Sequence, residues 1–313
     1  MTAVGATTNA LLRKGILAAA HNRPLGRFVQ RHGMRLGAGR FVAGTTLDEC
    51  VDVIRRLNAD GLKANTTLLG EGVTDAAGAR AIANEYRQIL QRLAAEQLRC
   101  NVALKLTHLG LVIDAELAFE NVRSVVEEAA ALGNFVRIDM EDSPSVDATL
   151  RTYRRLREEG LDSVGTVLQA YLYRSERDLE ELLPLGPNLR IVKGAYLEPP
   201  NVAFPKKADV DRNYVRLLET SLTGGGYTAV ATHDEALIRH TLEFTARHGI
   251  GRDRFEFQML YGVRQQRQRE LVREGFTVLV ATPFGPDWYP YLMRRLAERP
   301  ANVLFFVRSL TRR

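Results

Sequence analysis

The chain has 313 residues, of which 45% are apolar and 26% are charged, together with 25 Gly and 11 Pro. The apolar content excludes a disordered chain, and the modest Gly and Pro counts exclude collagen-like or low-complexity sequence. No run of about 18 apolar residues is present, so the sequence predicts no membrane span. Cys50 and Cys100 are too few for a disulfide scaffold or a four-thiolate metal site, and we expect buried or half-buried thiols in a reducing cytoplasm.

The net charge of +6 is concentrated at the N-terminus. Residues 1–47 hold seven basic residues and no Asp or Glu, so the remainder of the chain is close to neutral. We therefore divide the chain into a basic helical arm, residues 1–47, and a larger domain, residues 48–313. Such an arm is typical of a transit peptide, a helix on a membrane surface or a solvated docking helix. Aromatic residues are not interleaved with the basic ones, so we expect no nucleic-acid partner.

The larger domain repeats one pattern, in which short apolar, β-branched runs alternate with segments of helical periodicity. The predicted strands are residues 61–69, 101–107, 135–140, 163–169, 188–194, 227–232, 254–259 and 276–281. Eight strands that alternate with eight helical segments predict an α/β fold of the closed (β/α)8 TIM-barrel type. A doubly wound open sheet is the alternative, because periodicity does not report closure.

Polar side chains lie at or just past the carboxyl ends of seven predicted strands. They are Glu71, Lys105, Asp139, Gln169, Lys193, His233 and Gln258. Active-site residues of a parallel barrel collect at this end, because its loops converge on one mouth. We expect no metal: the chain has no His-x-His or His-Glu-x-x-His pair, and alternation points Asp142 away from Asp139 and Glu141.

Five sequence blocks resemble the proline dehydrogenase family. They are residues 136–143 (VRIDMEDS), 167–172 (VLQAYL), 190–196 (RIVKGAY), 255–258 (FEFQ) and 288–296 (WYPYLMRRL). The similarity runs in order from about residue 40 to the C-terminus. It implies the monofunctional bacterial form, a distorted eight-fold barrel that binds FAD, with a last helix over the barrel mouth.

The resemblance implies oxidation of L-proline to 1-pyrroline-5-carboxylate, the first step of proline catabolism, with hydride transfer to FAD N5 and a quinone as electron acceptor. Arg294 and Arg295 match the family's carboxylate-binding pair, and Lys105 matches the lysine that joins them. Planar, paired donors make arginine suitable for binding a carboxylate. Tyr291 and Leu260 are assigned to the same substrate site.

Asp139 and Arg190 are the predicted catalytic residues. Asp139 matches an aspartate beside Lys105, and we expect it to orient that lysine, with a plain ion pair as the alternative. Arg190 matches an arginine near the flavin, where a cation stabilises negative charge on the reduced ring. Glu71 resembles the acid that pairs with an arginine of the last helix, and it predicts a gate, with a static ion pair as the alternative.

The same resemblance predicts the FAD site. It places Met140 and Gln169 beside the isoalloxazine, Lys193, Gly194 and Ala195 at the ring or its phosphates, and Thr232 and His233 near the cofactor from the sixth strand. Because a quinone is dissolved in the membrane, we expect a cytoplasmic protein whose basic arm makes peripheral contact with the inner face of the membrane.

One departure from the family concerns the substrate. The family usually reads Tyr-Val-Pro-Tyr-Gly where residues 281–285 read ATPFG, so Ala281 replaces a tyrosine that packs on the substrate ring. Hydroxyproline oxidation is therefore an alternative activity. Two other classes stay open, namely an aldolase-like barrel with a Schiff base on Lys193 or Lys105 and a non-enzymatic flavin-binding protein.

Overall fold

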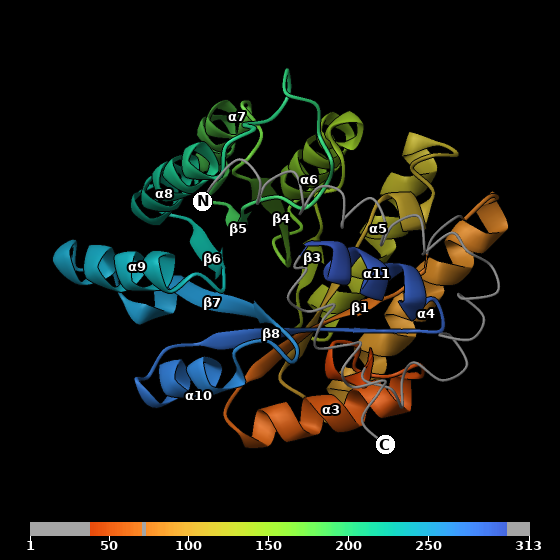
Figure 1. The fold of residues 1–313 in the computed structure, drawn as a ribbon. Coiled ribbons are helices and arrows are strands. Elements are labelled where there is room, and N and C mark those ends of the chain that lie inside the picture. Colours follow the sequence, from red (N-terminus) through yellow and green to blue (C-terminus); the bar gives the residue numbers. More distant parts are fainter. Residues whose placement is uncertain (1–37, 71–72, 299–313) are drawn as a thin grey trace.

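The computed structural model describes residues 38–70 and 73–298, with side chains as far as Met293. Eight parallel strands, hydrogen-bonded in chain order, close into a barrel in which β8 pairs with β1 (Figure 1). The strands are β1 (Lys63–Leu68), β2 (Cys100–Leu104), β3 (Val136–Ile138), β4 (Val164–Gln169), β5 (Asn188–Val192), β6 (Tyr227–Ala231), β7 (Phe255–Leu260) and β8 (Val278–Phe284). The predicted closed barrel is confirmed, and the open sheet is excluded.

A helix precedes β1 and a helix follows every strand. They are α3 (Leu47–Ala59), α4 (Ala76–Ala95), α5 (Ala115–Ala131), α6 (Val146–Glu158), α7 (Ser175–Leu182), α8 (Lys207–Thr223), α9 (Glu235–Arg247), α10 (Gln265–Arg273) and α11 (Trp288–Glu298). Several begin at side-chain caps: Thr46, Asp75 and Asp114 each accept a backbone N–H of the first turn. These caps fix where the outer helices start after each loop.

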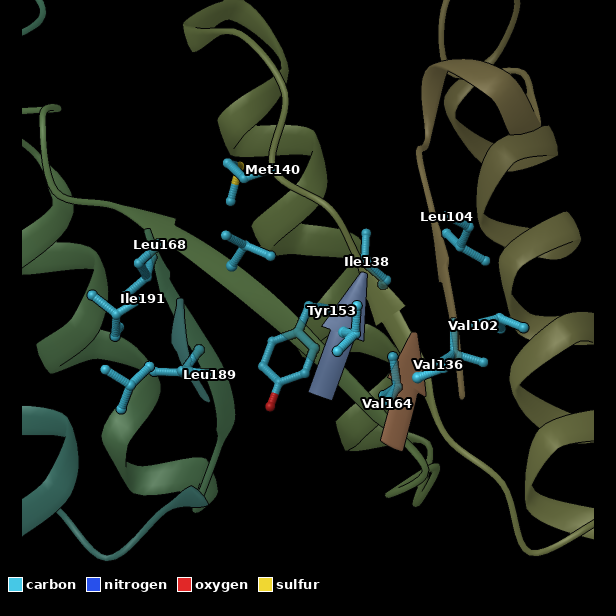
Figure 2. Close-up of a cluster of buried hydrophobic side chains, with 14 of the residues drawn as sticks. Val102, Leu104, Val136, Ile138, Met140, Tyr153, Val164, Leu168, Leu189 and Ile191 are labelled. Carbon is cyan, nitrogen blue, oxygen red and sulfur yellow. The ribbon is translucent and has the colours of Figure 1, made fainter. Parts of the chain in front are cut away.

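The main apolar core lies between the strands and the ring of outer helices. Strand side chains such as Val102, Val136 and Ile191 face outward and are fully buried, and Tyr153 of α6 packs among them (Figure 2). These β-branched and aromatic residues suit a strand whose outer face is covered by helices. The core therefore holds the strands in register and leaves the opposite face of each strand to line the barrel interior.

The barrel interior contains a polar layer that the apolar runs did not predict. Arg137 of β3 is 2% exposed and donates from Nη1 to the carbonyls of Thr166 (2.9 Å) and Asn188 (2.8 Å). Gly165 makes room for it, because a Cβ there would lie 2.5 Å from Arg137 Nη1. Burial lowers the pKa of Arg137. A buried, hydrogen-bonded guanidinium thus lies in the barrel interior.

The last strand is longer than the sequence indicates. Pro283 marks a strand end in sequence, since proline donates no ladder hydrogen bond, yet β8 continues to Phe284 along β1. The Pro283 carbonyl accepts from Ala43 N at 2.8 Å, so residues before α3 take up that position. Ala281 consequently lies inside the strand, beside Asn65 of β1 and Leu260 of β7.

Residues 38–43 pack on α11 and on the end of β1. Phe41 and Val42 form a small apolar cluster with Trp288 and Leu292 of α11 and with Leu69. Figure 1 shows α11 inside the ring formed by the other helices. The cluster fixes the described part of α11, whereas residues 1–37 of the predicted basic arm lie outside the described residues.

Two further expectations concern the cysteines and the membrane. Cys50 and Cys100 are free and buried, as expected, and burial raises the pKa of the Cys50 thiol to about 12. Among the described residues, no helix is both long enough and apolar enough to cross a bilayer.

Candidate active site

The polar side chains expected at the strand ends lie at one end of the barrel. Lys105, Asp139 and Lys193 directly follow β2, β3 and β5. Gln169 is the last residue of β4, His233 lies two residues after β6, and Gln258 lies in the second half of β7. The closed parallel topology brings these positions together at the barrel mouth. Glu71, the predicted gate, lies outside the described residues.

An ion pair between the two predicted catalytic residues is the centre of this site. Arg190 Nη1 donates to Asp139 Oδ1 at 2.7 Å, and the two side chains are 12% and 24% exposed. Asp139 was expected to face Lys105, but its ion-pair partner in the described structure is Arg190. The Asp139 carboxylate therefore holds the guanidinium from the β3 side.

Arg190 is also held by two residues that sequence reasoning did not assign. Its Nε donates to Gln258 Oε1 at 2.5 Å, and its Nη2 donates to Asn65 Oδ1 at 2.9 Å. Gln258 stood out as a strand-end residue, whereas Asn65 lies within a strand. Asn65 could have been found from the alternation of side chains along β1, which points it into the barrel beside Asn101 and Ala281.

Lys105 is half-buried at the mouth and makes no ion pair with another described residue. Its charge acts on Glu141, whose carboxylate accepts from Thr107 N (3.1 Å) and Thr107 Oγ1 (2.6 Å). Burial raises the pKa of Glu141, while Thr107 and the charge of Lys105 act in the opposite direction. Because no carboxylate among the described residues binds the Lys105 ammonium directly, we expect it to be available to an anionic ligand.

The two residues predicted to line the isoalloxazine are largely closed to solvent. Met140 is 7% exposed and Gln169 is 2% exposed. Gln169 Nε2 donates to the Glu141 carbonyl at 2.9 Å, which fixes the amide against the turn after β3. Met140 belongs to the core cluster of Figure 2. Both side chains are thus rigidly placed next to the Asp139 segment.

Lys193 is engaged by two carboxylates. Its Nζ lies 2.6 Å from Asp211 Oδ1 of α8 and 3.0 Å from Asp234 Oδ2 at the start of α9. The hydrogen bond from Lys193 holds the pKa of Asp234 below its usual value. A pocket of about 390 Å³ between α8 and α9 is lined by both aspartates, so Lys193 lies at its edge.

Gly194 takes a backbone conformation that excludes other residues. Its φ is +113°, and a Cβ would lie 2.2 Å from the Tyr171 ring. The chain therefore crosses Tyr171 closely before it reaches Ala195, which is exposed. This crossing requires glycine at position 194.

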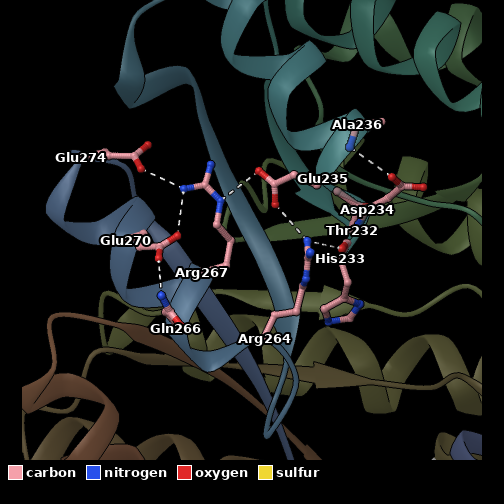
Figure 3. A network of polar contacts seen from close by, with 10 residues as sticks. All are labelled: Thr232, His233, Asp234, Glu235, Ala236, Arg264, Gln266, Arg267, Glu270 and Glu274. Carbon is pink, nitrogen blue, oxygen red and sulfur yellow. Dashed lines mark hydrogen bonds and ion pairs between the residues drawn. The ribbon is translucent and has the colours of Figure 1, made fainter. Parts of the chain in front are cut away.

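Thr232 and His233 shape the turn between β6 and α9 (Figure 3). Thr232 Oγ1 accepts from Asp234 N at 3.1 Å, and His233 Nε2 accepts from Leu260 N at 2.9 Å. Because Nε2 is an acceptor, the neutral ring carries its proton on Nδ1. Arg264 donates to the His233 carbonyl at 2.9 Å. His233 thus joins the β6 turn to the end of β7, where Leu260 is half-buried.

The helix across the mouth carries the remaining predicted substrate residues. Tyr291 is half-buried against the cluster formed with Trp288. Arg294 and Arg295 lie on the backbone of α11, and their side chains are outside the described part of the structure.

The fold and the site together define an α/β-barrel enzyme whose active site lies at the carboxyl ends of its strands. The profile of a family described as "Proline dehydrogenase" matches residues 50–308. The chain belongs to the proline dehydrogenase family, and it is an oxidoreductase.

Curated relatives match over nearly their whole length. Proline dehydrogenase 1 of Bacillus subtilis (strain 168) is 43% identical over 303 residues, which cover 97% of this chain and 100% of that protein. Proline dehydrogenase of Deinococcus radiodurans is 43% identical over 304 residues, covering 96% of this chain and 98% of that protein.

Solved structures show the same fold. Proline utilization A from Bdellovibrio bacteriovorus, inactivated by N-propargylglycine, superposes with a TM-score of 0.80 at 24% identity. The match covers 88% of this chain and 33% of that one, so this chain spans about a third of the larger protein.

Proposed function

We propose that this protein oxidises L-proline to 1-pyrroline-5-carboxylate, with FAD as hydride acceptor and a quinone as the final electron acceptor. Family membership supports the substrate, and the Arg190–Asp139 pair at the barrel mouth is the observation that carries the chemistry. Proline loses a hydride from the ring carbon next to nitrogen and a proton from the nitrogen, and a C=N bond forms. Bound FAD supplies the two-electron acceptor for this hydride.

The residues at the mouth fit a flavin cofactor. Arg190 keeps N–H donors that no described residue accepts, which suits a ring that becomes negatively charged. Lys193 and the pocket between α8 and α9 offer a cation and space for the remainder of a dinucleotide. We assign Met140, Gln169, Gly194, Ala195, Thr232 and His233 to the same cofactor site.

The protein's own side chains would bind and orient proline. The carboxylate of zwitterionic proline requires cations, and we assign Arg294, Arg295 and Lys105 to it. Tyr291 and Leu260 would pack on the ring. Glu71 would close the mouth by pairing with an arginine of α11. Asp139 holds Arg190 in place, and we also assign it a share in handling the proton that leaves the proline nitrogen.

Anaerobic titration with L-proline tests the proposed function. We expect the purified protein to be yellow and to lose its flavin absorbance as proline is added, with no change when NAD⁺ is the only acceptor offered. A flavin spectrum that proline leaves unchanged in intact holoenzyme would contradict the proposal.

The aldolase-like alternative is not favoured by the geometry of Lys193. Its Nζ is bound by Asp211 and Asp234, whereas a Schiff-base lysine must have its nitrogen free to attack a carbonyl. A protein that borohydride and a carbonyl substrate trap covalently would reverse this conclusion.

Ala281 predicts relaxed discrimination against trans-4-hydroxyproline. The residue is half-buried and points into the barrel beside Leu260, so a methyl group stands where the family usually has a phenol. Ala281→Tyr should lower KM for proline and raise it for the hydroxylated ring, because it fills the space beyond the substrate. Measuring kcat/KM for both substrates checks this, and an unchanged ratio would show that position 281 does not touch the ring.

The basic arm predicts salt-sensitive membrane contact. We propose a cytoplasmic enzyme that docks on the inner face of the membrane, where its quinone is dissolved. Each surface cation adds about 1 kcal/mol of attraction to an anionic bilayer, and salt screens it. Sedimentation with anionic vesicles should show binding that is lost in high salt and on deletion of residues 1–37. If the truncated protein binds the vesicles as well as the full-length protein does, the arm is not the part that contacts the membrane.

A further inference from the structure

The guanidinium of Arg190 is held on three sides and open on the fourth. It has five N–H donors, and three of them go to Gln258, Asp139 and Asn65 at 2.5, 2.7 and 2.9 Å. These acceptors come from β7, the residue after β3, and β1, so they fix the plane of the group from three directions. No described residue accepts from the other two N–H groups.

The acceptor at Nε depends on a residue one layer deeper in the barrel. An amide side chain presents either oxygen or NH₂, and Gln258 must present its oxygen to Arg190. Gln258 Nε2 donates to Glu256 Oε1 at 2.5 Å. Arg190 only donates and a carboxylate oxygen accepts, so the guanidinium and Glu256 require the same orientation of the Gln258 amide from its two ends. The hydroxyl of Tyr227 donates to the other Glu256 oxygen at 3.2 Å.

The acceptor at Nη2 is arranged in the same way. Asn65 Oδ1 accepts from Arg190, and Asn65 Nδ2 donates to Asn101 Oδ1 at 2.5 Å. Asn65 is 2% exposed and Gln258 is 6% exposed, so water has little access to either amide. The Glu256 carboxylate thus holds the orientation of Gln258, the hydrogen bond to Asn101 supports that of Asn65, and both acceptors converge on one guanidinium.

We propose that Gln258 and Asn65, oriented by Glu256 and Asn101, are positioning residues that aim the two free N–H donors of Arg190 at the cofactor and so raise the reduction potential of the flavin. This inference rests on the proposed function, because it takes FAD to be the group that Arg190 faces. None of the four residues needs to touch substrate or cofactor.

Two variants and one matched control test the orientation. Gln258→Leu removes the acceptor at Nε with little change in size. Glu256→Gln keeps the shape but replaces the carboxylate by an amide that can also donate, so the Gln258 amide is no longer held from below with its oxygen toward Arg190. Tyr227→Phe removes the hydroxyl bound to Glu256 on the side away from Gln258, and it leaves the carboxylate and the amide in place.

The readout is the midpoint potential of the bound flavin, measured by dye equilibration, together with its affinity for sulfite. For Gln258→Leu and Glu256→Gln we expect the equilibrium constant for reduction to fall at least tenfold, about 30 mV more negative for a two-electron couple. Sulfite should bind at least tenfold more weakly. Tyr227→Phe should resemble the wild type in both measurements.

The sign of the Glu256→Gln effect separates positioning from simple charge removal. Loss of a nearby carboxylate alone makes the surroundings more positive and would raise the potential, whereas misorientation of Arg190 lowers it. An unchanged or raised potential in Glu256→Gln holoenzyme would overturn the inference, and this variant alone decides if Gln258→Leu does not retain FAD.

Failure of the inference is distinct from failure of the proposed function. A wild-type flavoprotein that proline does not reduce would contradict the function, while the dye-measured potentials would still decide the positioning role. A wild-type protein that binds no FAD would overturn both. If the variants bind flavin, are reduced by proline and have the same midpoint potential as the wild type, only the positioning role would be overturned.

Discussion

Replacing Arg190 by Met is expected to lower the rate of proline-dependent flavin reduction by about 100- to 1000-fold. The guanidinium is a fixed cation with two N–H donors that no described residue accepts, and charge-assisted donors are most effective where negative charge develops in a partly buried site. Met fills a similar volume but supplies neither charge nor donors. Stopped-flow measurement of flavin absorbance under anaerobic conditions gives the rate directly.

The same substitution also affects folding, which the measurement must separate from catalysis. Arg190→Met leaves Asp139 without its cation, and an unpaired, partly buried carboxylate destabilises the fold. Flavin content and Tm therefore accompany the kinetics. Arg190→Lys is the matched control, because it keeps the charge but loses the planar set of donors, and an intermediate rate is expected. A rate within tenfold of wild type in folded Arg190→Met holoenzyme would remove Arg190 from the chemistry.

The barrel and the location of its polar residues could be predicted from local sequence. The apolar runs before Lys105, Asp139 and Lys193 are strands because their outer faces are covered by helices, and the residues that follow them fall at one mouth. These are short-range features, since each depends on a strand and the few residues after it.

The cross-barrel contacts could not be predicted, because they join distant parts of the chain. Arg190 and Asn65 are 125 positions apart, and their hydrogen bond exists only once the barrel has closed. The ion pair between Asp139 and Arg190 was not predicted for the same reason: an aspartate at a strand end has several cations within reach around the mouth. The end of β8 depends on its pairing with β1 as far as Leu68, and Ala43 supplies the N–H that the Pro283 carbonyl accepts.

Replacing Arg294 or Arg295 by Met is expected to raise KM for proline by about 10- to 150-fold each. Each change removes a charge-assisted hydrogen bond to the substrate carboxylate, which contributes about 1.5 to 3 kcal/mol. The helix that carries both residues is fixed across the mouth by the cluster of Phe41, Val42 and Trp288, so the arginines need not order the helix themselves. Steady-state kinetics with a quinone acceptor measures KM and kcat together.

The distinction between substrate binding and helix placement decides how this result is interpreted. If the arginines bind the carboxylate, KM rises while flavin content and Tm remain those of the wild type, because the residues that we propose for the cofactor lie on or just after the strands and not on α11. Arg123→Met is a suitable control, since Arg123 is 42% exposed on α5 and pairs with Glu127 at 3.0 Å. Unchanged proline saturation in both variants would mean that α11 does not supply the carboxylate site. Of the three cations that we assign to the substrate carboxylate, only Lys105 would then remain.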